Sequence, residues 1–182
     1  MAQLKRFVSP DDHVQGRIDA PVTLVEYGDY ECSHYGRAYP IVKSLQRQFG
    51  DKLRFVFRNF PLRELHPHAQ AAAETAEFAG VHGRFCEMHD AIFENQQRLS
   101  QRALIELAER LELDPGALEQ SLRRGEFHGR VQRDFSDGVR SGVNGTPTFF
   151  INGERHDADF ELQTLAAAIR HALPPERPEK SA

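Results

Sequence analysis

A strand–helix–strand pattern between residues 22 and 60 constrains the fold more than any other feature of the sequence. Two apolar runs rich in β-branched and aromatic residues, at 22–27 and 53–60, flank a segment at 32–50 whose apolar residues recur every three or four positions. A helix joined to two strands by such short connections is a βαβ unit, and its strands are parallel. We therefore predict an α/β fold built on this unit.

The alternation of residues within the two runs assigns their faces. Val22, Leu24 and Glu26 share one face of the first strand, while Thr23, Val25 and Tyr27 share the other. In the second strand, Leu53, Phe55 and Phe57 lie opposite Val56.

A single cysteine, Cys32, stands where the first strand gives way to the helix. The N–H groups and the positive dipole end of a helix N-terminus stabilise a thiolate relative to a thiol. His34 could add positive charge nearby. We predict that Cys32 is the reactive atom and that His34 supports it.

The first strand also contains an acidic residue, Glu26, six positions before Cys32. A carboxylate in a buried strand is costly unless it has a partner or a task. The alternative is that Glu26 sits at a strand end in contact with water.

Helical patterns fill the sequence from His66 to about Val143, and no strand candidate interrupts them. A second diagnostic segment follows, in which a Gly- and Asn-rich turn leads into Thr146-Pro147 and an apolar β-rich run. Asn152-Gly153 then predicts a hairpin turn, with a short strand at 154–156. A helix over residues 160–173 closes the pattern.

These elements divide the chain into four parts. We predict a loose lead-in at residues 1–20 with a short strand near Val14, a sheet-containing domain at 21–62 and 144–173, an inserted helical sub-domain at 63–143, and a flexible tail at 174–182.

Two motifs resemble the DsbA-like family of the thioredoxin superfamily: the strand, acid, turn and Cys32-Ser33-His34-Tyr35 segment, and the Thr-Pro-Thr-Phe-Phe-Ile run at 146–151. The resemblance implies a thioredoxin fold, a central mixed sheet flanked by helices, with an all-helical insertion. It further implies a buried acid at Glu26 near the thiol, and a cis-proline loop in which Thr146 and Pro147 face Cys32 and bind substrate. The family motif is Cys-x-x-Cys, but here Tyr35 replaces the second cysteine.

This departure leaves several functions open. Cys32 could act as a monothiol that forms mixed disulfides with glutathione or protein thiols. Cys86 could resolve those disulfides, although a lone cysteine on a helix is more often a small apolar filler. The fold could instead be a redox-inactive binding module, with Tyr35 covering the thiol. The resemblance extends to kappa-type glutathione transferases, which would make the chain a transferase or isomerase in which Ser33 could matter.

Composition limits the partners. The net charge is −4, without a sustained basic run, which argues against nucleic acid. No apolar stretch approaches the roughly 20 residues that span a bilayer, and the N-terminus lacks the apolar core of a secretory signal, so we expect a cytoplasmic protein. The histidines lack the paired spacing of a zinc site, so we expect no metal. We also expect no cofactor, although glutathione is a possible co-substrate. The sequence leaves the oligomeric state open.

Overall fold

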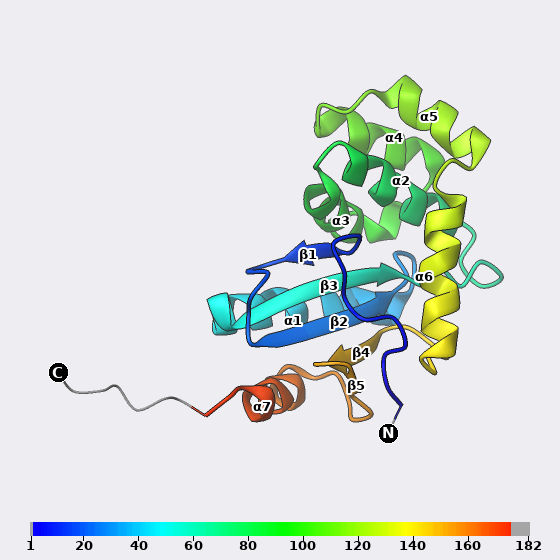
Figure 1. Ribbon diagram of the computed structural model, residues 1–182. Helices are drawn as coiled ribbons and strands as arrows, with labels where there is room; N and C mark the ends of the chain where they lie inside the picture. Colours follow the sequence, from blue (N-terminus) through cyan, green and yellow to red (C-terminus); the bar gives the residue numbers. More distant parts are fainter. Residues whose placement is uncertain (1, 176–182) are drawn as a thin grey trace.

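The computed structural model describes residues 2–175, and at positions 34 and 35 it describes the backbone alone. Its centre is a five-stranded sheet with the order β1-β3-β2-β4-β5 (Figure 1). The pair β2–β3 is parallel, and the other neighbouring strands are antiparallel. The strands are β1 (His13–Gln15), β2 (Val22–Gly28), β3 (Leu53–Asn59), β4 (Thr148–Ile151) and β5 (Glu154–Arg155). The predicted α/β fold with a mixed central sheet is confirmed.

Seven α-helices surround this sheet within the described residues. The first follows β2 directly and the last follows β5, whereas five lie together between β3 and β4 (Figure 1). They are α1 (Ser33–Phe49), α2 (Ala69–Val81), α3 (Phe85–Glu94), α4 (Gln101–Arg110), α5 (Pro115–Arg124), α6 (His128–Arg140) and α7 (Leu162–Ala172). Short 3-10 turns occur at η1 (Gly50–Lys52) and η2 (Gln96–Arg98).

The two faces of the sheet belong to two separate hydrophobic clusters. The larger cluster contains the face of Leu24 and Phe55, together with residues of α1, α7 and the inserted helices. The smaller cluster contains the face of Val25 and Val56, together with Leu4 from the N-terminal segment. The faces therefore follow the alternation predicted from the sequence, and both are covered.

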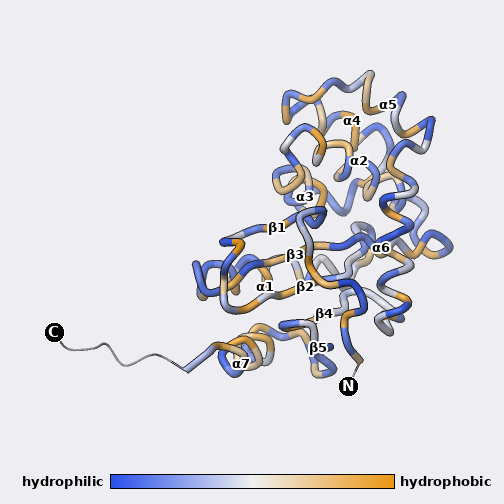
Figure 2. Tube along the Cα trace, in the orientation of Figure 1, coloured by the Kyte–Doolittle hydropathy of each residue, from blue (hydrophilic) through white to orange (hydrophobic). Residues whose placement is uncertain are grey.

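The helical insertion is not separate from the sheet, because α6 returns to it. The rings of Phe60, after β3, and Phe135, on α6, stack with 4.4 Å between their centroids. Gly138 on α6 leaves room for Phe60, whose ring would lie 2.7 Å from a Cβ at this position. Along α6, hydrophilic and hydrophobic residues alternate (Figure 2), and the apolar side meets the sheet.

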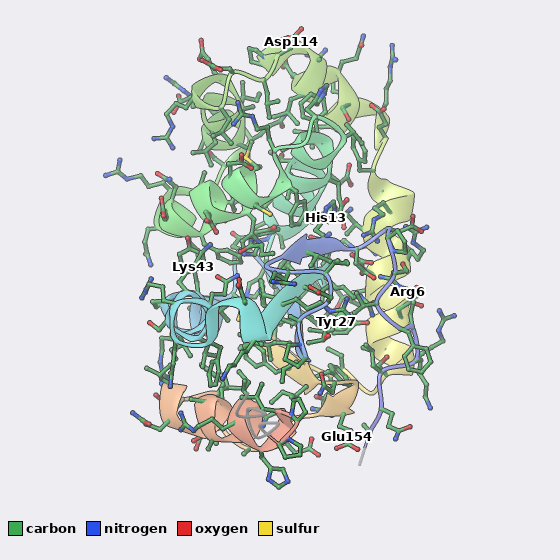
Figure 3. The ribbon with its side chains drawn as sticks, turned by 60° about the vertical axis from the view of Figure 1, so that its left-hand side comes forward. Arg6, His13, Tyr27, Lys43, Asp114 and Glu154 are labelled. Carbon is green, nitrogen blue, oxygen red and sulfur yellow. The ribbon has the colours of Figure 1, made fainter. Side chains whose placement is uncertain are left out.

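The N-terminal segment packs against the sheet and α6, so the prediction of a loose lead-in is wrong. Leu4 is buried, and its N–H donates to the carbonyl of Gly153 at 2.9 Å. The side chain of Arg6 lies against α6 (Figure 3), where it pairs with Asp134 at 2.8 Å. The short strand expected near Val14 is β1. Ion pairs hold this segment, and an apolar periodicity cannot reveal them.

The end of the chain follows the predicted order. Asn152 and Gly153 both have positive φ angles, 49° and 88°, and form the turn between β4 and β5. The closing helix α7 ends at Ala172, one residue before its predicted end. Most of the predicted tail, residues 176–182, lies outside the described residues.

Candidate active site

Cys32 lies at the N-cap of α1, four residues after β2 ends at Gly28. The intervening turn is built around Asp29, which is buried. Its carbonyl accepts from the N–H of Cys32 at 3.2 Å, and its carboxylate accepts from the N–H of Glu31 at 2.8 Å. The turn therefore delivers the cysteine to the start of the helix, where the first N–H groups have no partner within the helix.

The carboxylate of Asp29 also fixes a second segment, the loop between β3 and α2. It accepts from the N–H of Leu62 at 2.7 Å and contacts Nδ1 of His66 at 2.8 Å. Glu31 binds the same loop, because its carboxylate accepts from the N–H of His68 at 2.6 Å. His66 and His68 thus hold the active-site turn in place.

The sulfur of Cys32 faces the loop before β4. Sγ lies 3.5 Å from the carbonyl oxygen of Thr146, a residue 114 positions away in the chain. The Thr146–Pro147 peptide bond is cis. The structure thus brings together three of the residues singled out in the sequence: Cys32, Thr146 and Pro147.

Cys32 is largely enclosed by its neighbours. Cys32 keeps 6% of its surface exposed, and it is part of the larger hydrophobic cluster. The hydroxyl Oγ1 of Thr146 is buried and has no hydrogen-bond partner among the residues described. A group that approaches Cys32 therefore meets a sulfur atom beside a backbone carbonyl.

Glu26 is fully buried within β2, so the alternative that it touches water at a strand end is wrong. Its neighbours in register are Phe57 on β3 and Phe149 on β4. The strand continues from Glu26 into the turn that carries Cys32. The sequence therefore correctly indicated a buried acid on this strand.

The first turn of α1 contains the other motif residues. Ser33 is the first helical residue and is exposed. The backbones of His34 and Tyr35 belong to the same turn, but their side chains lie outside the described part of the structure. The supporting role of His34 and the covering role of Tyr35 therefore stay predictions.

Cys86 lies on α3, in different surroundings from Cys32. Both cysteines are free thiols. Burial raises the pKa of the Cys86 thiol above its usual value of 9.0, and the carboxylates of Glu87 and Asp90 add to this effect. Lys43 on α1 reaches toward α3 (Figure 3) and pairs with Asp90 at 2.6 Å.

One charged neighbour of Cys86, Lys43, belongs to the later part of α1. Lys43 is eleven residues beyond Cys32, which corresponds to roughly 16 Å of helix rise. A disulfide requires Cα atoms within about 7 Å of each other. Cys86 thus has Lys43 and Asp90 among its charged neighbours, and the two cysteines form no disulfide in the described structure.

Two residues at the site were not found from the sequence. Gln96, in η2 of the insertion, donates from Nε2 to the carbonyls of Tyr30 and Cys32 at 2.9 and 2.8 Å. Gly36 on α1 leaves room for this side chain. The sequence contains no signal for Gln96, because a tertiary contact creates its role. The acid and turn before Cys32 gave a partial signal for Asp29.

Within residues 2–175, no cluster of three or more histidine, cysteine or acidic residues could hold a metal ion. Across the same residues, no helix has both the length and the apolar character needed to cross a membrane.

Comparison with known proteins links this geometry to a family. The family model described as thioredoxin matches residues 8–171. Among solved structures, BdbD from Bacillus subtilis in its oxidised form has a TM-score of 0.80 and 25% identity, covering 87% of this chain and 91% of that one. A thioredoxin-like oxidoreductase from Silicibacter pomeroyi has a TM-score of 0.77 and 25% identity, with coverages of 90% and 93%.

Curated relatives with higher sequence identity are named as antiporters and not as thioredoxin-like proteins. A protein of Salinispora arenicola named Na(+)/H(+) antiporter NhaA 1 is 46% identical over 169 residues, which are 91% of this chain and 26% of that protein. One from Herminiimonas arsenicoxydans, named Na(+)/H(+) antiporter NhaA, is 37% identical over 89% of this chain and 26% of its own length. This chain thus spans about a quarter of these relatives. It belongs to the thioredoxin family and has the fold of the DsbA-like members.

Proposed function

We propose that this chain exchanges disulfides as a monothiol, through Cys32. The observation that carries the proposal is the position of one sulfur, at the N-cap of α1 and 3.5 Å from the Thr146 carbonyl, in a motif whose fourth position is Tyr35. A phenol cannot form a bond to sulfur, so the motif itself supplies no second thiol. An external thiol has to complete each cycle.

The exchange has two displacement steps. The Cys32 thiolate attacks one sulfur of a disulfide R–S–S–R′, so the Cys32–S–R bond forms as the S–S bond breaks, and R′–S⁻ leaves and takes up a proton. A second thiolate R″–S⁻ then attacks the sulfur of R in the mixed disulfide. It forms R–S–S–R″ and regenerates the Cys32 thiolate. Electrons balance, because one disulfide is consumed and another is formed.

The loop at Thr146 supports a peptide-like molecule, such as glutathione or a protein segment, as the partner that reacts with Cys32. An extended peptide or glutathione presents backbone N–H groups, and the Thr146 carbonyl provides an acceptor beside the sulfur. Disulfides of glutathione or of proteins are therefore the proposed substrates, and glutathione or a protein thiol completes the cycle. The proposal concerns this chain alone, and the antiporter name belongs to relatives of which it spans 26%.

The test is to incubate the protein with oxidised glutathione and map the products by peptide mass spectrometry. We expect one glutathionyl group on Cys32, removed again by reduced glutathione, and no such product in the Cys32→Ser variant. The Tyr35→Cys variant would supply the missing thiol, so we expect an intramolecular disulfide between positions 32 and 35 in place of the stable adduct.

Three results would overturn the proposal. If Cys32 stays unmodified in the folded protein but reacts once the protein is unfolded in denaturant, the fold is a redox-inactive binding module. If the protein instead joins reduced glutathione to an electrophile such as 1-chloro-2,4-dinitrobenzene, with no disulfide exchange, the kappa-type transferase alternative holds. If the Tyr35→Cys variant stays inert, the active site has been assigned to the wrong segment.

A further inference from the structure

Gln96 connects the helical insertion to the backbone at the reactive cysteine. Its Nε2 donates one hydrogen bond to the carbonyl of Cys32 at 2.8 Å and a second to the carbonyl of Tyr30 at 2.9 Å. An amide nitrogen has two N–H donors, so both are used here. The residue belongs to η2, 64 positions beyond Cys32, and thus reaches the active-site turn from another part of the fold.

These two bonds set the orientation of two peptide planes. In a trans peptide the N–H points away from the C=O, so a carbonyl held toward Gln96 turns the following N–H to the opposite side. For the Cys32 carbonyl, that N–H belongs to Ser33, the first helical residue and one of the N–H groups without an intrahelical partner. For the Tyr30 carbonyl, it belongs to Glu31 and donates to Asp29.

Gly36 gives Gln96 the space for this contact. A Cβ built at Gly36 would lie 2.6 Å from Oε1 of Gln96, closer than real Cβ contacts allow. An alanine at this position would displace the end of the Gln96 side chain. The close approach of η2 to α1 therefore depends on a missing side chain in the second helical turn.

We propose that Gln96 is a positioning residue for Cys32, acting as a double hydrogen-bond donor that fixes the peptide planes before and after this residue, Tyr30–Glu31 and Cys32–Ser33. The proposal rests on the exchange function proposed above. It also gives the insertion a part in the reaction, because η2 lies within it. Gln96 acts through the backbone and is not itself a group that reacts.

The experiment compares the rate of glutathionylation at Cys32, normalised to folded protein, in Gln96→Met, Gln96→Glu and the wild type. Methionine keeps the length of the side chain and loses both donors. Glutamate keeps the shape almost unchanged, but its carboxylate accepts and would face two carbonyls. Gln97→Met is the matched control, because Gln97 is the exposed neighbour in η2.

We expect Gln96→Met to slow the reaction about three- to tenfold, the range expected for lost hydrogen bonds of ordinary strength. Gln96→Glu should be slower still, and Gln97→Met should match the wild type. A role in packing alone predicts the reverse order, with the near-isosteric glutamate close to the wild type. That order would overturn the proposal.

Gly36→Ala is an independent test, because alanine favours the helix while it displaces Gln96. We expect slower glutathionylation without a lower thermal midpoint, and no further slowing when Gly36→Ala is added to Gln96→Ala. Equal rates in wild type, Gln96→Met and Gly36→Ala would contradict the role of Gln96. A wild-type protein that forms no adduct at all would contradict the proposed function instead, so the two failures are distinguishable.

Discussion

At the residue scale, the reactivity of Cys32 depends on groups that lie far from it in the sequence. The Thr146 carbonyl is 114 positions away and the Gln96 amide is 64 positions away, yet both contact the cysteine. The motif around the cysteine supplies the helix N-terminus, and the fold supplies the remaining contacts. A motif alone therefore identifies the reactive atom but not its surroundings.

A second residue, His89 on α3, makes the stability of the protein depend on pH. It is buried, and its Nδ1 lies 3.1 Å from the hydroxyl of Tyr30. Burial lowers its pKa to about 3, and the positive charges of Lys43 and His13 contribute. The folded protein therefore holds this imidazole neutral at pH values where an unfolded chain would protonate it.

We predict that His89 makes the protein less stable in mild acid. An unfolded imidazole titrates near about 6.5, so as the pH falls from there toward about 3 the unfolded state binds more protons than the folded state. The free energy of unfolding should then fall by up to about 1.4 kcal/mol per pH unit from this group. Urea denaturation at a series of pH values measures that slope.

The matched variants for this measurement are His89→Gln, which removes the buried imidazole, and His171→Gln, at an exposed histidine near the end of α7. The pH dependence should be flatter in His89→Gln than in the wild type. Equal slopes in the wild type and His89→Gln would show that His89 contributes nothing to acid sensitivity.

At the scale of elements, buried ion pairs hold the N-terminal segment to the sheet. Arg58 on β3 and Asp12 just before β1 both have fully buried side chains and are 2.9 Å apart. Burial raises the pKa of the Asp12 carboxyl, but hydrogen bonds and charge from Arg58 outweigh it and hold the pKa below its usual value. Arg58 also donates to the hydroxyl of Tyr27 at 3.0 Å.

We predict that Asp12→Ala destabilises the protein by about 3–5 kcal/mol, because it leaves the Arg58 guanidinium buried without its carboxylate. Asp11→Ala changes an exposed neighbour and should stay within about 0.5 kcal/mol of the wild type. Chemical denaturation of the three proteins measures the difference. Similar losses in both variants would contradict the role given to the Arg58 pair.

The strands could be predicted from the sequence, whereas the packing of the N-terminal segment through ion pairs could not. Apolar alternation assigned both faces of β2 and β3 correctly, because it reports burial of each side chain. Arg58 is a charged residue within the predicted strand β3, yet it is fully buried. Its partner Asp12 lies in a polar, turn-rich segment whose pattern gave no sign of packing. Charged residues that are buried as ion pairs leave no repeating pattern in the sequence.

At the scale of the whole molecule, two separated motifs were enough to predict the fold. The cysteine turn and the Thr146-Pro147 segment lie on opposite sides of the insertion in the sequence and meet at one end of the sheet. The insertion was located from its lack of strand pattern. That α6 covers a face of the sheet, and that η2 contacts the active-site turn, could not be predicted, because both depend on how the helices pack.

The insertion also extends away from the reactive end. Asp114, which caps α5 by accepting from the N–H groups of Gly116 and Ala117, lies at the far end of the insertion from the sheet (Figure 3). Only η2 in the insertion donates a hydrogen bond to the Cys32 backbone among the described contacts. The insertion therefore meets the active-site turn through η2 and through the loop of His66 and His68.

The most direct test of the central claim uses the two cysteines of the native protein as competitors. A substoichiometric amount of iodoacetamide is added, and peptide mass spectrometry gives the fraction of label on each sulfur. Cys32 lies at a helix N-cap, whereas Cys86 has a thiol pKa raised by burial and by two carboxylates. We predict that Cys32 takes most of the label. Labelling of Cys86 first, or of neither cysteine until the protein is unfolded, would contradict the account.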